Sequence, residues 1–411
     1  MIGKTILKYA FRSQSRHFRR TMLSVIGVGI GTAMGILANC WIFGALEMEI
    51  RAASESGVGH LKVVPVGWLE TRENSLRLSG WEKTLTEAKT LPGARQVAFR
   101  ARTNGLLAFG NRTTGVEVTG VDPDSERVFN RIVYKSQIAG RYLEPGDTGK
   151  VVIGREIARR LKVGLDDDLM ITLSGKVEME SAMLLIVGII DTGSSELDSS
   201  ICHINLADLE RITGISGPAE ISILLNNYKR IDSTREILRG KLGNQNMVIT
   251  WKESVPELAA GAEGDKSFMN LLALIIIMVV GLGIMSAQLT AVMERRREFG
   301  ILSALGMPGR QIVALILTEA FWVGLGGALI ALVLSTPIAY YLASRGVNIS
   351  ALMGGMNSFG GVLIDPVVYG HLGWWVVWYA FGVSLVATIA ASLYPARLAR
   401  KIDPAEALRR I

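Results

Sequence analysis

Four long apolar runs divide the chain. They cover residues 21–46, 268–293, 312–343 and 373–394. Each exceeds the about 20 residues that an α-helix needs to cross the hydrocarbon core of a bilayer. Buried helices of a soluble protein would be shorter and would carry polar interruptions. The pattern therefore predicts four membrane-spanning helices, one before and three after a long intervening segment.

The intervening segment, residues 47–267, has a mixed pattern. Short runs of β-branched and apolar residues, bounded by Gly, Asn and Asp, alternate in it with helical stretches. The pattern predicts single strands at 61–66, 96–110, 113–121, 184–192, 221–227 and 247–254. Residues 151–173 predict a strand, a helix closed by Gly164 and a second strand. Residues 199–214 predict a strand followed by a helix, and residues 232–242 predict a helix. This alternation predicts an α+β domain of one or two lobes.

The distribution of charge predicts the orientation. The net charge is +7, but Lys and Arg gather at the ends of the apolar runs rather than among aromatic residues, which argues against a nucleic-acid partner. Of the 16 basic residues outside 47–267, 15 fall on one side of a four-span chain. Such an excess marks the cytoplasm. Segment 47–267 holds 28 basic and 31 acidic residues and is placed on the opposite side.

The predicted fold class is a membrane protein with four transmembrane α-helices, one plus three, and a large extracytoplasmic α+β domain between helices 1 and 2. The predicted order is a cytoplasmic N-terminal segment (1–20), helix 1 (21–46), the extracytoplasmic domain (47–267), helix 2 (268–293), a cytoplasmic segment (294–311), helix 3 (312–343), an extracytoplasmic loop (344–372), helix 4 (373–394) and a cytoplasmic tail (395–411). Helix 1 lacks a small-x-small cleavage site, so we interpret it as a retained anchor.

Few side chains point to catalysis or metal binding. The histidines are His17, His60, His203 and His371, and none has a second metal ligand at a useful spacing. We interpret His60 and His203 as surface or hydrogen-bonded structural residues, and Cys40 and Cys202 as unbridged, buried hydrophobes. The sequence contains neither a G-x-x-x-x-G-K-[ST] loop nor a G-x-S-x-G motif. The prediction is a non-enzymatic chain that binds no metal or cofactor and has no ATPase of its own.

Small and acidic residues inside the spans raise two further points. Gly27, Gly31 and Gly35 recur every four residues in helix 1, which favours close packing on another helix or in a dimer. The alternative is the ordinary use of glycine in membrane helices. Glu319 lies inside helix 3. It either has a role within the membrane or sits near the cytoplasmic interface and pairs with an arginine.

The segment between helices 2 and 3 contains a short half-apolar stretch. Residues 294–305 predict a helix on which Phe299, Leu302 and Leu305 recur at i, i+3 and i+6, with Ile301 beside them. Such an apolar face can lie on the membrane or dock in a groove of another protein.

Helix-breaking residues and arginines mark the two ends of this predicted helix. Gly306 predicts its C-terminal stop, and Pro308 enforces the stop. Arg295, Arg296 and Arg297 stand at its start, where they can meet lipid headgroups. The question is why a chain would place three arginines between two apolar runs.

These features together resemble the MacB/FtsX-like permeases of ABC transporters, and within them the lipoprotein-releasing LolC/LolE-like branch. RREFGILSALGMPGRQI resembles that family's coupling segment, E-x-G-x-x-x-A-x-G-x-x-x-x-x-I, which falls here on Glu298, Gly300, Ala304, Gly306 and Ile312. LYPARLARKIDPAEALR resembles its C-terminal signature, which falls on Pro395, Ala396, Ala399, Asp403, Pro404 and Ala407. SGVGHLKVVP and GRYLEPGDTGKVVIGREIARRLKVGLDD resemble its external domain.

The resemblance implies a permease that works with a separate ABC ATPase in two copies and with a second permease subunit, identical or different. The partner ATPase would bind ATP and Mg. The residues implied in ATPase coupling are Glu298, Phe299, Gly300, Leu302, Ala304, Leu305 and Gly306. ATP-driven closure on the cytoplasmic side would move the spans and flex the external domains, so that substrate need not cross the membrane. This is mechanotransmission.

The resemblance also implies a place and a substrate class. The protein would lie in the bacterial inner membrane, with both termini cytoplasmic and its large domain in the periplasm. It would extract lipoproteins or other amphiphiles from the outer leaflet, in contact with membrane lipids and a periplasmic chaperone or adaptor. Substrate would enter between the outer ends of helices 1 and 2, near Leu37, Trp41, Phe43, Phe268 and Leu272.

Two alternatives keep the fold and change the function. One is MacB-like efflux of periplasmic peptides or drugs with an adaptor and an outer-membrane channel. The other is FtsX-like activation of a cell-wall hydrolase, in which nothing is transported.

Overall fold

The computed structural model describes residues 18–401, except residues 72, 74, 177, 351–357, 360, 361 and 364. The chain divides into two compact units. The helical unit takes the chain up to Leu46, then Gly264–Val347, and the chain from Val368 onward. The sheet unit takes Glu47–Glu263 and Asn348–Val367. Residues from both sides of the long intervening segment thus build the helical unit.

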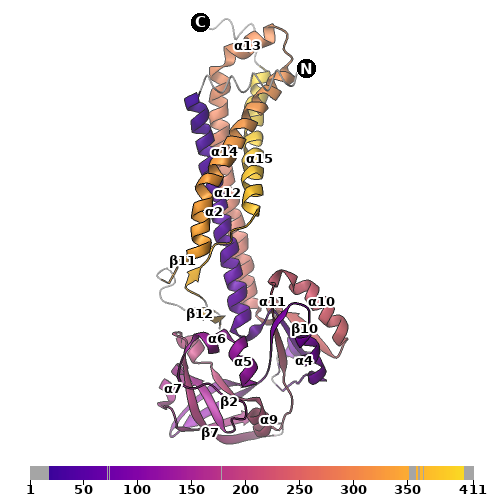
Figure 1. The fold of residues 1–411 in the computed structure, drawn as a ribbon, viewed down its shortest axis with the longest axis vertical. Coiled ribbons are helices and arrows are strands. Elements are labelled where there is room, and N and C mark those ends of the chain that lie inside the picture. The colour runs from indigo at the N-terminus through magenta and orange to yellow at the C-terminus, as the bar shows by residue number, and fades with distance from the viewer. Residues whose placement is uncertain are drawn as a thin grey trace. The chain divides into compact units, whose positions relative to one another are not determined.

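Four long helices account for most of the helical unit (Figure 1). They are α2 (Phe18–Ala53), α12 (Pro256–Glu294), α14 (Gly309–Arg345) and α15 (Trp375–Arg400). All four are long and apolar enough to cross a membrane. The short helix α13 (Arg296–Ala304) joins α12 to α14, at the end of the bundle where α2 begins and α15 ends.

All four helices run beyond the predicted spans, and two of them do so on the side of the sheet unit. Helix α2 continues to Ala53, and helix α12 already begins at Pro256. The added residues are rich in Ala and Glu, which are good helix formers, and Pro256 occupies the first helical position, where proline is favoured. Residues 47–53 of α2 and 256–263 of α12 belong to the sheet unit, so each helix is continuous from one unit into the other.

Helix α2 packs against the three later long helices. Val28 of α2 forms a buried cluster with Ile284 of α12 and Val323 of α14. Thr32 Oγ1 and Ser384 Oγ of α15 lie 2.9 Å apart in a buried hydrogen bond. Hydroxyl pairs of this kind satisfy polar groups where no water is available.

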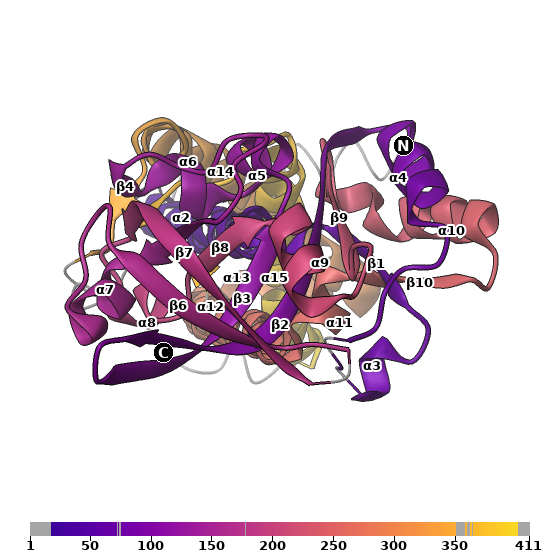
Figure 2. The same ribbon diagram turned by 90° about the horizontal axis from the view of Figure 1, so that it is seen from below.

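A ten-stranded sheet organises the sheet unit (Figure 2). Its strands are β1 (Leu61–Pro65), β2 (Ala94–Phe109), β3 (Arg112–Val121), β4 (Gln137–Gly140), β5 (Lys150–Gly154), β6 (Asp168–Ser174), β7 (Met179–Asp191), β8 (Cys202–Asn205), β9 (Glu220–Leu225) and β10 (Asn246–Thr250). They follow the order β10-β1-β9-β2-β3-β8-β5-β7-β4, and β6 pairs with both β2 and β7. Strands β2, β3, β8, β5, β7 and β6 therefore close into a ring, from which β9, β1 and β10 extend along the first half of β2.

The ring encloses the main core of the sheet unit. Leu107, Val118, Ile153, Ile171 and Ile186 are all fully buried in it. Short helices accompany the strands: η1 (Ser54–Val58), α3 (Trp68–Thr71), α4 (Trp81–Lys89), α5 (Pro123–Phe129), α6 (Arg131–Lys135), α7 (Arg155–Leu161), α8 (Ser195–Asp198), α9 (Leu206–Thr213), η2 (Tyr228–Arg230), α10 (Ile231–Leu242) and α11 (Trp251–Ser254).

The predicted strands and helices of this segment are confirmed, with two corrections at their ends. Helix α7 ends before Lys162, which adopts a left-handed φ of 58°, and not at Gly164. The strand predicted over 247–254 stops at Thr250, because Thr250 and Glu253 form a capping box that starts α11. Helices α4, α5 and α6 and strand β4 were not predicted.

The loop predicted at 344–372 is tied to the sheet unit through its middle part. Asp365 forms an ion pair with Arg131 of α6. The hydroxyls of Ser358 and Ser194 also form a buried hydrogen bond. The loop contains the short strands β11 (Val347–Asn348), β12 (Ser358–Phe359), β13 (Val362–Leu363) and β14 (Val367–Val368).

Candidate functional site

Helix α13 ends where its sequence predicts. Gly306 has a positive φ of 91°, which a residue without Cβ adopts at little cost. Its N–H donates to Ser303 O, and Met307 N donates to Leu302 O, each at 3.0 Å. Pro308 then caps the start of α14. The predicted stop at Gly306 and Pro308 is confirmed.

Burial divides the apolar side chains of α13. Phe299 is 1% exposed and packs in a cluster with Ile316 of α14 and Ala396 of α15, and Leu302 packs against the same cluster. Leu305 is 80% exposed. The expectation that Phe299, Leu302 and Leu305 share one open face is therefore wrong. At 3.6 residues per turn, positions i and i+6 point about 120° apart, and Leu305 already caps the helix end.

The rest of the described chain leaves a different side of α13 open. We define the outer face of α13 as the exposed residues Glu298, Ile301, Ala304 and Leu305. Its apolar members Ile301 and Leu305 are 43% and 80% exposed. Gly306 is also exposed, next to this face. The implied coupling residues that are buried or packed inward are Phe299, Gly300 and Leu302.

A buried ion pair fixes α13 to α14 and accounts for the first of the three arginines. Arg295 is only 5% exposed. Its Nη1 lies 2.9 Å from both carboxylate oxygens of Glu319, and its Nε donates to Glu298 Oε2 at 2.9 Å. Its guanidinium also stacks on the Phe299 ring, 5.0 Å from the centroid. Of the two alternatives for Glu319, the pairing with an arginine is the one observed.

The glycines of helix 1 do not share one contact. A Cβ added at Gly31 would overlap Val280 of α12, and one at Gly35 would lie 3.1 Å from Tyr379 Oη of α15. A Cβ at Gly27 would meet no atom within 4 Å. Two of the three predicted packing positions therefore pack within this chain, whereas Gly27 lies on an exposed part of α2.

The implied substrate-facing residues lie on both α2 and α12. Phe43 is 42% exposed and packs edge-on against Trp375 of α15, with ring centroids 5.4 Å apart. Phe268 and Leu272 of α12 are 59% and 38% exposed. Leu37 and Trp41 are half-buried. Phe43 is thus partly occupied by a contact to α15, and the other four keep some open surface.

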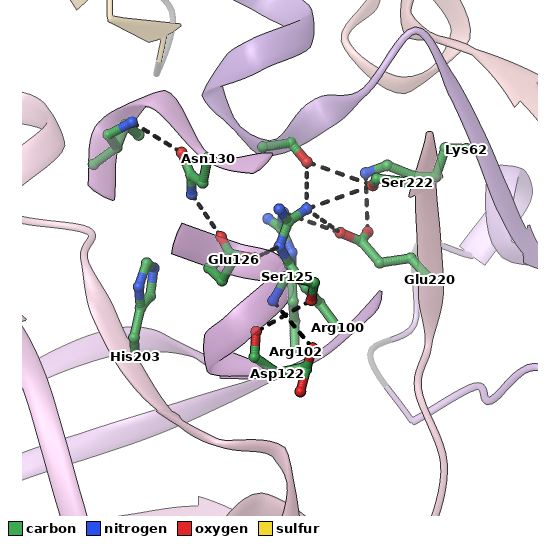
Figure 3. Close-up of polar contacts among 12 residues, drawn as sticks. Lys62, Arg100, Arg102, Asp122, Ser125, Glu126, Asn130, His203, Glu220 and Ser222 are labelled. Atoms are coloured by element: carbon green, nitrogen blue, oxygen red, sulfur yellow. Dashed lines mark hydrogen bonds and ion pairs between the residues drawn. The ribbon is translucent and has the colours of Figure 1, made fainter. Parts of the chain in front are cut away.

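The sheet unit contains a buried charge network that the sequence analysis did not predict (Figure 3). Arg100 of β2 is 2% exposed, and its Nε donates to Glu126 Oε2 at 2.6 Å. Glu220 of β9 accepts from Lys62 Nζ at 2.9 Å and from Arg102 Nη2 at 3.3 Å. Burial alone would raise the pKa of Glu220, but the charges of Arg102, Lys62 and Arg100 outweigh it and hold this pKa well below its usual range.

This network holds the point where the chain leaves α2. Arg100 Nη1 donates to the carbonyl oxygen of Gly57 in η1, and Ser222 Oγ donates to the same oxygen at 3.5 Å. Gly57 has a positive φ of 102°, so the turn requires glycine. The buried charges therefore fix the start of the sheet unit to strands β2 and β9.

The two histidines of the sheet unit are satisfied structural residues, as predicted. His60 Nδ1 accepts a hydrogen bond from Leu225 N at 3.0 Å, and His203 Nδ1 lies 2.9 Å from Tyr142 Oη. Burial lowers the pKa of His203 to about 4, so the ring is neutral at physiological pH. Cys202 is buried and unbridged, and burial raises the pKa of its thiol to about 12.

Two family models together match most of the chain. A model described as the MacB-like periplasmic core domain matches residues 21–241, and one described as FtsX-like permease C-terminal matches residues 270–404. The chain belongs to the MacB/FtsX-like permeases of ABC transporters. The described part of the C-terminal signature, Pro395, Ala396 and Ala399, is buried at the end of α15, and Asp403, Pro404 and Ala407 lie outside the described residues.

Individual relatives cover almost the whole permease. The lipoprotein-releasing system transmembrane protein LolC of Xylella fastidiosa (strain 9a5c) is 21% identical over 95% of this chain and 93% of its own length. The macrolide export ATP-binding/permease protein MacB of Hyphomonas neptunium is 26% identical over 98% of this chain and 60% of its own length. The crystal structure of the extracellular domain of YknZ from Gram-positive bacteria aligns with a TM-score of 0.34 and 16% identity, over 46% of this chain and 98% of that one.

Membership of the family establishes the general architecture of the chain. It is a membrane protein with four membrane helices and a domain of the MacB periplasmic type between the first and the second. Homologues of this chain are permease subunits of ABC transporters, and members of the family act with ABC ATPases.

Proposed function

We propose that this permease couples ATP hydrolysis by a separate ATPase to movement of its sheet unit, and so extracts lipoproteins or other amphiphiles from the outer leaflet. The observation that carries the proposal is the attachment of α13. Its inner side is buried against α14 and α15, Arg295 anchors it to Glu319, and its outer face stays open. A push on that face is transmitted to packed helices rather than absorbed by a loose loop.

Chain continuity supports the second half of the coupling. Helices α2 and α12 both continue without interruption into the sheet unit, and residues 348–367 of the α14–α15 connection belong to that unit. The chain therefore passes between the two units at four points, one for each long helix, and each is a covalent route for a displacement of the helices. The buried network around Gly57 holds the first residues of the sheet unit after α2 in place on strands β2 and β9.

Likeness to LolC over 95% of this chain and 93% of the relative supports a lipoprotein or a similar amphiphile as substrate. On this proposal the protein lies in the bacterial inner membrane with both termini cytoplasmic, and two ATPase copies and a second permease subunit complete the complex. Leu37, Trp41, Phe268 and Leu272 offer apolar surface to an acyl chain, and Phe43 borders it. ATP and Mg bind to the partner ATPase.

A second candidate function is export of a periplasmic peptide or drug with an adaptor and an outer-membrane channel. The observation that favours it is the likeness to the macrolide export protein MacB, at 26% identity over 98% of this chain. The two functions predict the same ATPase contact and different periplasmic partners, so one purification distinguishes them.

The first experiment is affinity purification of the intact protein in mild detergent, with mass spectrometry of everything retained, including lipid-modified proteins. It compares the parent with Leu305→Asp, which puts a charge on the outer face of α13, and with Val128→Asp. Val128 is 53% exposed in the sheet unit and serves as the matched control. We expect an ATPase to co-purify with the parent and the control, and its recovery to fall at least tenfold with Leu305→Asp.

The other proteins recovered decide the substrate class. Lipoproteins in the parent eluate support extraction from the outer leaflet. An adaptor protein supports export, and a hydrolase regulator supports mechanical activation; each would replace the substrate part of the proposal. Equal ATPase recovery with all three proteins would remove the outer face of α13 as the coupling surface.

A further inference from the structure

The sheet unit contains a polar cavity of about 470 Å³ that is open to solvent on one side. Its basic lining residues are Arg51, Arg95, Arg131 and Lys135. Its acidic lining residues are Glu47, Glu55 and Asp365. With four basic and three acidic groups, the cavity carries one net positive charge.

The acidic groups arrange the basic groups without using all of their donors. Asp365 pairs with Arg131 and lies 3.0 Å from Lys135 Nζ, and Glu55 lies 3.1 Å from Arg95 Nη2. Arg131 is only 1% exposed, and its Nε has no hydrogen-bond partner among the described residues. A buried guanidinium with an unused donor is costly unless a ligand or water fills the site.

Neutral groups of the wall add further donors. Because Leu225 N donates to His60 Nδ1, the hydrogen of the neutral His60 ring is on Nε2. Burial and the charge of Arg95 lower the pKa of His60 to about 4, so this tautomer persists at physiological pH. Asn226 and Tyr228 also line the cavity. The wall is therefore rich in donors that suit an anion with several oxygens.

We propose that this cavity binds the phosphate group of an anionic phospholipid headgroup. Guanidinium groups bind phosphate oxygens in a two-pronged geometry, and three of them line the cavity. Asp365 occupies part of the same donor set, so the phosphate competes with this carboxylate for Arg131 and Lys135. The site concerns a resident lipid and stands whatever substrate the permease moves.

The position of Arg51 along its helix favours a lipid over a soluble ligand. Helix α2 is continuous from Phe18 to Ala53, and the apolar run of its sequence, which predicts the span, ends at Leu46. Arg51 is five residues further on, which corresponds to about 7.5 Å along the axis. The headgroup layer on each side of a bilayer is about 5–8 Å thick. With the apolar run up to Leu46 in the hydrocarbon core, this spacing would place Arg51 at headgroup depth, where phosphates are abundant.

The test uses the full-length permease in non-ionic detergent and isothermal titration calorimetry. The probes are dihexanoyl phosphatidylglycerol, its zwitterionic phosphatidylcholine analogue and inorganic phosphate. Lys135→Gln and Arg95→Gln remove donors at partly exposed side chains, so folding is retained, and Asp365→Asn removes the competing carboxylate. Lys241→Gln is the control, because Lys241 is similarly exposed and pairs with Glu87 away from the cavity.

We expect phosphatidylglycerol to bind, Lys135→Gln and Arg95→Gln to weaken it about tenfold each, Asp365→Asn to tighten it, and Lys241→Gln to leave it unchanged. Tighter binding of phosphatidylglycerol than of inorganic phosphate identifies a lipid as the source. Equal affinity for both supports the phosphate site and assigns it to a free phosphate. No binding of either probe, or equal binding of phosphatidylcholine that no variant changes, would overturn the proposal.

Discussion

Buried ion pairs between single charged residues hold neighbouring elements of this protein in place. Arg295 pairs with Glu319 in the N-terminal part of α14, and Arg100 pairs with Glu126 next to Gly57 in the sheet unit. In both places the side chains are nearly removed from solvent. Such pairs contribute little net stability compared with apolar residues, but breaking one leaves an uncompensated charge. They therefore define position more than they add stability.

The joint at Arg295 gives a prediction at this scale. Arg295→Met should destabilise the permease by about 3 kcal/mol, because Glu319 loses its bidentate partner while it stays partly buried. The double variant Arg295→Met/Glu319→Leu should recover most of that loss, because neither charge then needs a partner. Thermal unfolding of the three purified proteins in one detergent measures the effect. Equal midpoints for parent and single variant would show that the pair does not position α13.

At the scale of elements, glycines set how closely α2 approaches its neighbours. Gly31 faces Val280 of α12, and Gly29 faces Ile330 of α14, each with no room for a Cβ. Gly27, in the same four-residue register as Gly31, faces open space. The four-residue repeat thus predicts a small-residue stripe correctly, but only the packed structure decides which members of the stripe make contacts.

Gly31 and Gly27 form a matched pair for testing this. Gly31→Leu should lower the stability of the helical unit by about 1–3 kcal/mol, because the new side chain must displace Val280 from α12. Gly27→Leu should leave folding unchanged. Thermal unfolding and the yield of monodisperse protein measure both. If Gly27→Leu instead prevents assembly of the permease pair, Gly27 lies at the interface between subunits.

At the scale of the whole molecule, the distribution of basic residues predicts which end of the helical bundle faces the cytoplasm. The start of α2, helix α13 and the end of α15 lie at one end of the helical bundle (Figure 1), and basic residues of the chain cluster in those segments. The sheet unit has nearly balanced charge and large apolar cores of its own. This arrangement agrees with a cytoplasmic end and a periplasmic domain.

Cysteine labelling tests this orientation. The chain has two cysteines, so Cys40→Ala/Cys202→Ala gives a background into which single cysteines are introduced. Leu305→Cys should react with a membrane-impermeant maleimide only after the inner membrane is opened. Val128→Cys should react once the reagent reaches the periplasm. Labelling of both positions from the same side would contradict the four-span orientation.

The sequence by itself determined the number of spans, their order and the end of α13. These features depend on local quantities: the length of apolar runs, the position of basic residues, and the glycine and proline at 306 and 308. The strands of the sheet unit other than β4 were also predictable, because β-branched runs and turn residues mark them. The extra length of α2 and α12 was missed because good helix formers continue past the apolar limit.

Only the tertiary structure decided which charges are buried and which side of α13 is open. Lys62, Arg100 and Glu220 look like solvated strand residues until strands β1, β2 and β9 are paired and place them together. Phe299 and Leu305 look equivalent until α14 and α15 cover one of them. Burial depends on contacts between residues far apart in the chain, and a local pattern carries no information about which distant residues will supply them.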